Sequence, residues 1–225
     1  MNALLNAHTP RGRSRSTHVG LTSNVLPEAQ RSQTGVSSDY VQKANHEWFV
    51  LRVTYNRTQK ACDIISTANM QSYMPMHYVI KKEIGKKKRM LQPLLPNLFF
   101  VYATRETVNS IIKKKGEEAS VLKFYLDKTK PLEDNGKHPP LTIPFTSMTN
   151  FIKATSTDSE HVRIVSAEQC HYKSGDIVKV IEGEFKGVTG RVARIAGQQR
   201  IVVEISGLCL VATAYIPTEF IEIVK

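Results

Sequence analysis

Cysteine is scarce in this chain: Cys62, Cys170 and Cys209 are the only three among 225 residues. Their odd number and wide spacing argue against a disulfide framework and are typical of a reducing compartment, so we expect a cytoplasmic protein. No apolar run approaches the length of a membrane span. Near the start, Leu4 and Leu5 are the only two adjacent large apolar residues, which argues against a signal peptide. We therefore expect no membrane association.

The motifs of enzymes and cofactor sites are also missing. The sequence contains no phosphate-binding loop, no G-x-S-x-G elbow and no dinucleotide fingerprint. The adjacent Cys170 and His171 suggest a nucleophile or a metal ligand, but neighbouring side chains on a strand point to opposite faces. No C-x-x-C or H-x-x-x-H pattern accompanies them. We therefore expect no catalytic residue, no metal site and no cofactor.

Positive charge is in excess, with 31 Lys and Arg against 20 Asp and Glu and a net charge of +11. Such a balance favours an anionic partner, most commonly nucleic acid, although it can also serve solubility alone. The excess is uneven: residues 46–160 carry 18 basic and 11 acidic side chains, whereas residues 161–225 carry eight and seven. The middle of the chain is therefore where we expect the surface that faces an anion.

The first two thirds of the chain divide into a polar extension and a mixed α/β region. Residues 1–45 are rich in Ser and Thr without apolar periodicity, which predicts a disordered N-terminal extension. Residues 46–154 form the first predicted domain. Its pattern predicts strands at 47–54, 73–80, 97–102 and 121–127. It also predicts a charged hairpin tip at 81–90. Three helices are expected: the first begins after Asn56, the second begins after Thr104, and the third lies within 143–155.

The last third of the chain reads as a linker followed by short strands only. Residues 155–161 are polar and lack apolar anchors, which is typical of a flexible linker. Residues 162–225 predict a five-stranded small β-barrel with strands at 177–181, 188–195, 200–205, 209–215 and 219–223. Its β-branched residues favour a stable barrel. The fold class predicted for the whole chain is therefore α+β.

Two sets of residues are candidates for binding. The first is basic and comprises Arg52, Arg57, Lys60 and the tip at 81–89, which could follow a phosphate backbone or could be a solvated surface. The second is apolar and comprises Trp48, Leu95, Leu98, Phe99 and Phe100. Alternation places Leu98 and Phe100 on one face of their strand and Phe99 on the other. One face should be core, and the other is either core as well or a partner site.

Residues 46–225 resemble the NusG family of transcription elongation factors. The resemblance rests on WFVLRVTYNRTQK, the YMP turn, PLLPNLFFVY and the glycine-rich stretch GDIVKVIEGEFKGVTGRV of the barrel type called KOW. The ending GLCLVATAYIPTEFIEIV is most similar to specialised members, the RfaH-like and especially the UpxY-like antiterminators of polysaccharide operons. The resemblance implies an N-terminal α/β sandwich with a mainly antiparallel sheet (NGN type), a flexible linker and a five-stranded SH3-like barrel.

The resemblance also implies roles for individual residues. Residues implied to bind the clamp helices of RNA polymerase are Trp48, Leu95, Leu98 and Phe100. Residues implied to contact non-template DNA are Arg52, Tyr55, Arg57, Lys60, Lys86, Lys87, Lys88 and Arg89. Asn109, Ser110 and Ile111 occupy the place of the gate-contacting segment, without the specialised motif found there. Phe185 and Lys186 occupy the barrel loop through which family members meet a ribosomal protein or a termination factor.

The sequence therefore predicts a monomeric, non-enzymatic regulator that binds RNA polymerase and suppresses pausing and termination, specifically an operon-specific antiterminator. The alternative is a ribosome-associated KOW-domain protein that binds RNA. That alternative predicts a basic barrel, whereas residues 161–225 are nearly neutral.

Overall fold

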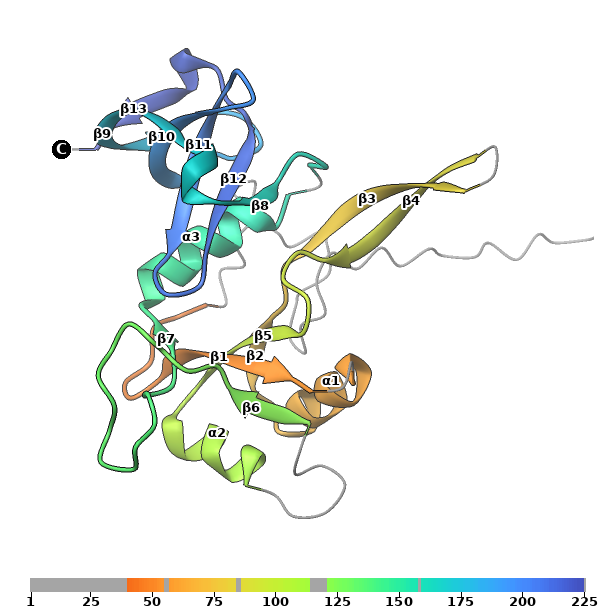
Figure 1. Cartoon of the computed structure of the whole chain (residues 1–225), viewed down its shortest axis with the longest axis vertical. Helices are drawn as coiled ribbons and strands as arrows, with labels where there is room; N and C mark the ends of the chain where they lie inside the picture. The colour runs from red at the N-terminus through yellow and green to blue at the C-terminus, as the bar shows by residue number, and fades with distance from the viewer. Residues whose placement is uncertain (1–39, 55–56, 84–85, 114–120, 158, 225) are drawn as a thin grey trace, which may run out of the picture.

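The computed structural model describes residues 40–54, 57–83, 86–113, 121–157 and 159–224, with side chains described for all of these except residues 82, 83, 86 and 173–175. Two antiparallel sheets lie on either side of one helix, and a two-stranded hairpin projects from between them (Figure 1). Most of the predicted N-terminal extension lies outside the described residues. Antiparallel sheets and separate helices agree with the predicted α+β class.

The N-terminal sheet is centred on β1 (Glu47–Val53), which confirms the strand predicted at 47–54. On one side β1 pairs with β5 (Leu98–Ala103), and β5 pairs with β2 (Gln71–Tyr73). On its other side β1 pairs with two short strands in turn, β6 (Leu122–Phe124) and β7 (Thr142–Ile143). Every pairing is antiparallel, and each pair is formed by strands that are not consecutive in the chain.

Helices cover both faces of the N-terminal sheet. Helices α1 (Thr58–Thr67) and α2 (Arg105–Ile112) bury their apolar sides against one face, where Phe99 is fully buried. Helix α3 (Phe145–Thr155) covers the other face, where Phe100 is fully buried. The alternation of Phe99 and Phe100 is confirmed, and both faces turn out to be core.

The helix starts were predicted with mixed success. Thr104 caps α2 as expected, because its hydroxyl accepts a hydrogen bond of 3.3 Å from the Thr107 amide. Asn56, the predicted cap of α1, lies outside the described residues, and Arg57 at the N-cap position makes no side-chain capping bond. The longest helix in the described part of the chain, α3, has 11 residues, whereas a bilayer span requires about 20.

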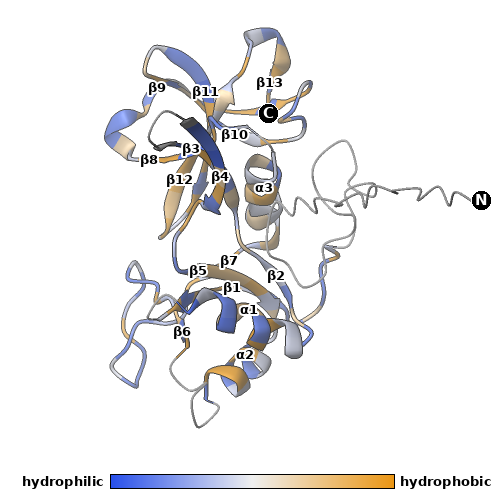
Figure 2. Cartoon of the chain, turned by 90° about the vertical axis from the view of Figure 1, so that its right-hand side faces the viewer, coloured by the Kyte–Doolittle hydropathy of each residue, from blue (hydrophilic) through white to orange (hydrophobic). Residues whose placement is uncertain are grey.

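The predicted charged hairpin consists of β3 (Met76–Glu83) and β4 (Lys86–Pro93), which pair only with each other. Most of the predicted tip, residues 81–90, belongs to these two strands, so the turn is shorter than predicted, and Ile84 and Gly85 lie outside the described residues. The hairpin extends away from the two sheets as a ribbon, and much of its length is hydrophilic (Figures 1 and 2). A lone two-stranded ribbon is marginally stable in water, so its side-chain contacts matter to its stability.

The C-terminal sheet contains six strands in the order β13-β9-β10-β11-β12-β8, one more than the five predicted. Its strands are β8 (Arg163–Val165), β9 (His171–Val180), β10 (Thr189–Ile195), β11 (Gln198–Ile205), β12 (Cys209–Tyr215) and β13 (Ile221–Ile223). Three residues are too few to show an alternating pattern, which is why β8 was missed. Assignment of this sheet to the KOW barrel type stays a prediction.

Within the glycine-rich stretch, the structure shows most clearly why glycine is required at position 190, which is Gly190. A Cβ atom at this position would lie 2.4 Å from the carbonyl oxygen of Val202 and 2.8 Å from the side chain of Ile201. Strand β11 therefore passes so close to β10 that only glycine fits between them.

Helix α3 is packed between the two sheets. The ring of Phe151 lies 5.3 Å from that of Phe100 in the N-terminal sheet. On the other side, the Asn150 side chain accepts a 2.7 Å hydrogen bond from the Thr189 amide and donates one to the Thr189 carbonyl. A single buried cluster consequently runs from the N-terminal sheet through α3 into the C-terminal sheet. The predicted linker begins inside this helix at Thr155, and the predicted domain boundaries stay predictions.

Replacing Phe151 with Ala should destabilise the whole chain, because it removes a fully buried ring from the helix shared by both sheets. We expect a loss of about 3–5 kcal/mol in the free energy of unfolding, measured by urea denaturation. Phe145→Ala, at a partly buried position of the same helix, is the matched control and should cost clearly less. Equal losses for the two variants would contradict the central role of Phe151.

Candidate functional site

One face of the N-terminal sheet changes from buried to exposed along its strands. Cross-strand pairing sets Trp48 opposite Tyr102, Val50 opposite Phe100, and Arg52 opposite Leu98. The first two pairs are buried under α3, and the exposed fraction is 1% for Trp48 and 0% for Phe100. Arg52 is exposed and Leu98 is half-buried. We call this surface the α3 face, and its open end is the part at Arg52 and Leu98.

Aromatic rings form the cover of the α3 face. Besides Phe151 on Phe100, the ring of Phe145 lies 5.6 Å from Tyr102 and that of Tyr40 lies 5.5 Å from Trp48. Within the described residues the indole nitrogen of Trp48 is buried without a hydrogen-bond partner. A buried donor left unpaired costs about 1–3 kcal/mol, so the covered state carries an energetic penalty at Trp48.

The open end of the α3 face joins apolar and cationic side chains. Leu95 and Leu98, both expected to contact a partner, are partly buried and pack at the edge of the core. Register places Arg52 between Leu98 on β5 and Lys123 on β6, and Lys123 is exposed. Sequence reasoning missed Lys123, because only the pairing of β6 with β1 brings it beside Arg52.

The other predicted cations at the start of α1 are only partly described. Arg57 and Lys60 are half-buried, and the Arg57 guanidinium donates a 3.4 Å hydrogen bond to the Thr54 hydroxyl. Tyr55 lies outside the described residues. These positions follow β1 directly, so they lie near the end of the strand that carries Arg52.

The hairpin places like charges opposite one another. Lys81 pairs with Lys88 across the two strands, and Lys82 pairs with Lys87. Lys87 and Lys88 are exposed and make no ion pair with any described residue. The side chain of Lys86 lies outside what the structure describes. Opposed like charges destabilise a sheet, so this arrangement favours an anionic partner that would neutralise them.

Arg89 differs from the hairpin lysines because it is engaged within the protein. Its guanidinium lies 3.6 Å from the centre of the Tyr78 ring on the neighbouring strand. Its Nε also forms a 2.8 Å ion pair with Glu160, in the segment between α3 and β8. Arg89 therefore anchors the hairpin to the connection that leads into the C-terminal sheet.

The remaining predicted contacts differ in exposure. In α2, Asn109 and Ser110 reach the surface, whereas Ile111 is buried against the N-terminal sheet. In the loop between β9 and β10, Lys186 is exposed, but only 5% of Phe185 is accessible. Ile111 and Phe185 thus contribute to the core here, and partner contacts at these two places would involve their exposed neighbours.

The titratable groups do not form a reactive centre in the described residues. Burial raises the pKa of the Cys209 thiol to about 12, and it also raises the pKa of Cys170. A thiol with a raised pKa is rarely ionised at neutral pH and is a poor nucleophile. No group of three or more His, Cys, Asp or Glu residues among those described could hold a metal ion.

Comparison with protein families matches residues 46–136 to NusG, described as transcription termination factor nusG. The match covers β1 to β6 and the hairpin, and it ends before β7, α3 and the C-terminal sheet. The match agrees with the resemblance to the NusG family seen in the sequence. A search of curated proteins found no match.

Replacing Lys88 with Glu should stabilise the hairpin, because it sets an acidic side chain opposite Lys81. We expect a gain of about 0.2–1 kcal/mol, seen as slower hydrogen exchange of the hairpin amides. Lys128→Glu, at an exposed loop position, is the control and should leave those amides unchanged. Faster exchange in the Lys88 variant would show that the opposed lysines are not a source of strain.

Proposed function

We propose that this chain, whose residues 46–136 match the NusG family, is a non-enzymatic regulator of transcription elongation that binds RNA polymerase and suppresses pausing and termination. The observation that carries the proposal is the open end of the α3 face. There an apolar edge and two exposed cations lie side by side within the matched domain. A protein that binds both a polymerase and its DNA needs an apolar surface and a cationic surface next to each other.

The polymerase contact is proposed to use the apolar part of the α3 face. Leu95 and Leu98 lie at its edge and make the first contact with the clamp helices. Trp48 and Phe100 lie under α3, so they take part only after α3 and the C-terminal sheet have moved away. The unpaired indole N–H of Trp48 supports such a change, because exposure would let it donate to water or to the partner.

The nucleic-acid contact is proposed to use the cations around this face. Arg52 and Lys123 line the open end, and Lys87 and Lys88 extend along the hairpin. Phosphates of the non-template strand would replace the counterions of these side chains, and their release favours binding. The ribbon would thereby keep the DNA beside the polymerase contact. In α2, the half-buried Asn109 and the exposed Ser110 would meet the gate region.

The finer assignment is to an operon-specific antiterminator, for example of a polysaccharide biosynthesis locus. It is supported by the similarity of the ending GLCLVATAYIPTEFIEIV to the UpxY-like members. The C-terminal sheet would act as a second module, a KOW barrel that recruits a ribosomal protein or a termination factor beside the exposed Lys186. Two linked weak contacts bind more tightly than either alone because the second is intramolecular. The chain would work as a monomer.

Locking α3 to the N-terminal sheet tests the polymerase contact. The double variant Tyr73→Cys, Thr155→Cys places thiols on β2 and on α3, at two positions whose side chains hydrogen-bond each other at 2.7 Å, and a short reducible cross-linker should join them. We expect capture of core RNA polymerase to fall about tenfold or more on cross-linking, because the binding-competent state becomes rare. Reduction of the same sample should restore it.

The wild-type chain, treated with the same cross-linker and reduced in parallel, is the control and should capture polymerase equally in both states. Undiminished capture by the locked variant would show that the buried part of the α3 face is not needed. Co-purification with ribosomal particles in place of polymerase would contradict the proposed function as a whole.

Removing the hairpin charges tests the nucleic-acid contact and the antiterminator assignment together. Transcription in vitro over the leader of the neighbouring operon should show more read-through with the wild-type protein than without it. Lys87→Glu with Lys88→Glu should lose most of this effect, because the substitutions repel phosphate. Lys128→Glu changes charge on an exposed loop and should keep it. Equal read-through with both variants would exclude the hairpin from the mechanism.

A further inference from the structure

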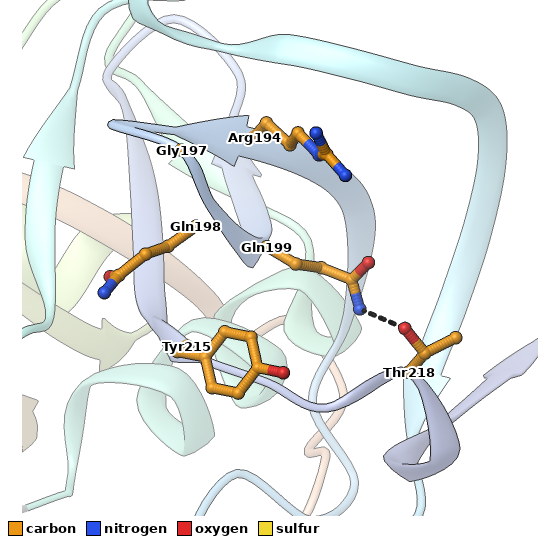
Figure 3. A pocket seen from close by; sticks show the side chains of 6 residues that line it. All are labelled: Arg194, Gly197, Gln198, Gln199, Tyr215 and Thr218. Atoms are coloured by element: carbon orange, nitrogen blue, oxygen red, sulfur yellow. Dashed lines mark hydrogen bonds between the residues drawn. The ribbon is translucent and has the colours of Figure 1, made fainter.

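A polar pocket of about 430 Å³ lies at one end of the C-terminal sheet, outside every contact proposed above. Its lining consists of Arg194, Gly197, Gln198, Gln199, Tyr215 and Thr218 (Figure 3). The volume falls within the range of about 300–1,000 Å³ that is usual for small-ligand sites. The residues come from β10, β11, β12, the turn between β10 and β11, and the turn that follows β12.

The pocket begins where the apolar side of the sheet ends. Val192 and Ile201 face each other across β10 and β11, and both are buried in the core. The next pair on the same side is Arg194 and Gln199, and it is polar. This side therefore changes from Val and Ile to Arg and Gln within one step of the ladder.

The two glutamines are held in fixed orientations. Gln199 donates from Nε2 to the carbonyl of Ile216 at 3.1 Å and to the hydroxyl of Thr218 at 3.2 Å, the second of which Figure 3 shows as a dashed line. Both amide hydrogens are then used, and Oε1 remains as an acceptor. On the other side of the strand, Gln198 accepts a 2.7 Å bond from the buried Arg200. A ligand would therefore meet an acceptor whose position is already set.

Tyr215 and Arg194 complete the pocket. Tyr215 is 56% exposed, and its side chain makes no hydrogen bond or ring contact with any described residue. Arg194 is exposed and forms no ion pair within the described residues. In Figure 3 Arg194 and Gln199 extend to the same side of the ribbon, and the Tyr215 ring lies beneath Gln199 in that view. An open aromatic face, a fixed acceptor and a guanidinium thus surround one space.

We propose that this pocket binds one nucleotide of a single-stranded nucleic acid. The base stacks on Tyr215, its exocyclic amine donates to Oε1 of Gln199, and its phosphate contacts Arg194. Stacking needs an unpaired base, because both faces of a base are covered inside a duplex. Adenine, cytosine and guanine carry an exocyclic amine, whereas uracil and thymine do not. Uracil and thymine offer only the ring N3–H, which lies between two carbonyl oxygens that would be repelled by Oε1. The pocket should therefore prefer an amine-bearing base over uracil or thymine.

The near-neutral charge of this part of the chain is consistent with such a site. Residues 161–225 carry eight basic and seven acidic side chains, so a long phosphate track is not expected there. A site for one nucleotide needs only one phosphate contact and gains most of its affinity from stacking. This inference is independent of the proposed polymerase contact, since the two involve different sheets.

The experiment uses the full chain carrying Lys87→Glu and Lys88→Glu, so that binding at the hairpin is weakened. Fluorescence anisotropy measures its affinity for labelled octamers of cytidine and uridine, as RNA, and of deoxycytidine and thymidine, as DNA. We expect Tyr215→Ala to lower affinity for the cytosine strands about tenfold, within the range measured for stacked bases. Tyr215→Phe keeps the ring and should keep binding. Arg194→Ala should reduce the salt dependence by about 0.7 in slope.

Tyr172→Ala is the matched control, because Tyr172 is another tyrosine of the same sheet, 40% exposed, and does not line the pocket. It should leave affinity unchanged. Loss with Tyr215→Ala on RNA alone would assign the site to RNA, and equal loss on both would assign it to any single strand. The same affinity for the Tyr215→Ala and Tyr172→Ala proteins, or for the uridine and cytidine octamers, would overturn the proposal.

Discussion

The structure depends most on the packing of helix α3 against two sheets at once. Phe151 fills the α3 face beside Phe100, and the preceding residue, Asn150, binds both backbone groups of Thr189 in the C-terminal sheet. The first contact is apolar, and the stabilisation that it provides scales with the buried area. The second is directional and fixes the position of the helix along the strand. The same helix thereby decides how much of the α3 face is accessible and where the C-terminal sheet lies.

Much of the fold could be predicted from the sequence because its signals are local. Alternation around Phe99 and Phe100 predicted strand β5, and Thr104 marked the start of helix α2. The cover over Phe100 could not be predicted, because it comes from Phe151 on α3, about fifty residues further along the chain. Lys123 was missed for a similar reason, since its place beside Arg52 follows from strand pairing alone.

The hairpin and the C-terminal pocket show two different ways to prepare a surface for an anionic strand. On the hairpin, Lys81 and Lys88 face each other, so the free protein carries a repulsion that a bound phosphate backbone would relieve. In the pocket, Gln199 is already fixed by two hydrogen bonds, so its side chain would lose little conformational entropy when a base binds. The first surface is selective for charge and the second for the hydrogen-bonding edge of one base.

The ion pair between Arg89 and Glu160 links the hairpin to the C-terminal sheet thermodynamically. Glu160 lies in the short segment between α3 and β8, so any displacement of that segment separates the two charges. A phosphate that takes the place of Glu160 on Arg89 removes one of the contacts that hold the segment down. Because coupling between two equilibria is reciprocal, DNA on the hairpin would favour release of the segment, and release would strengthen DNA binding by the same factor.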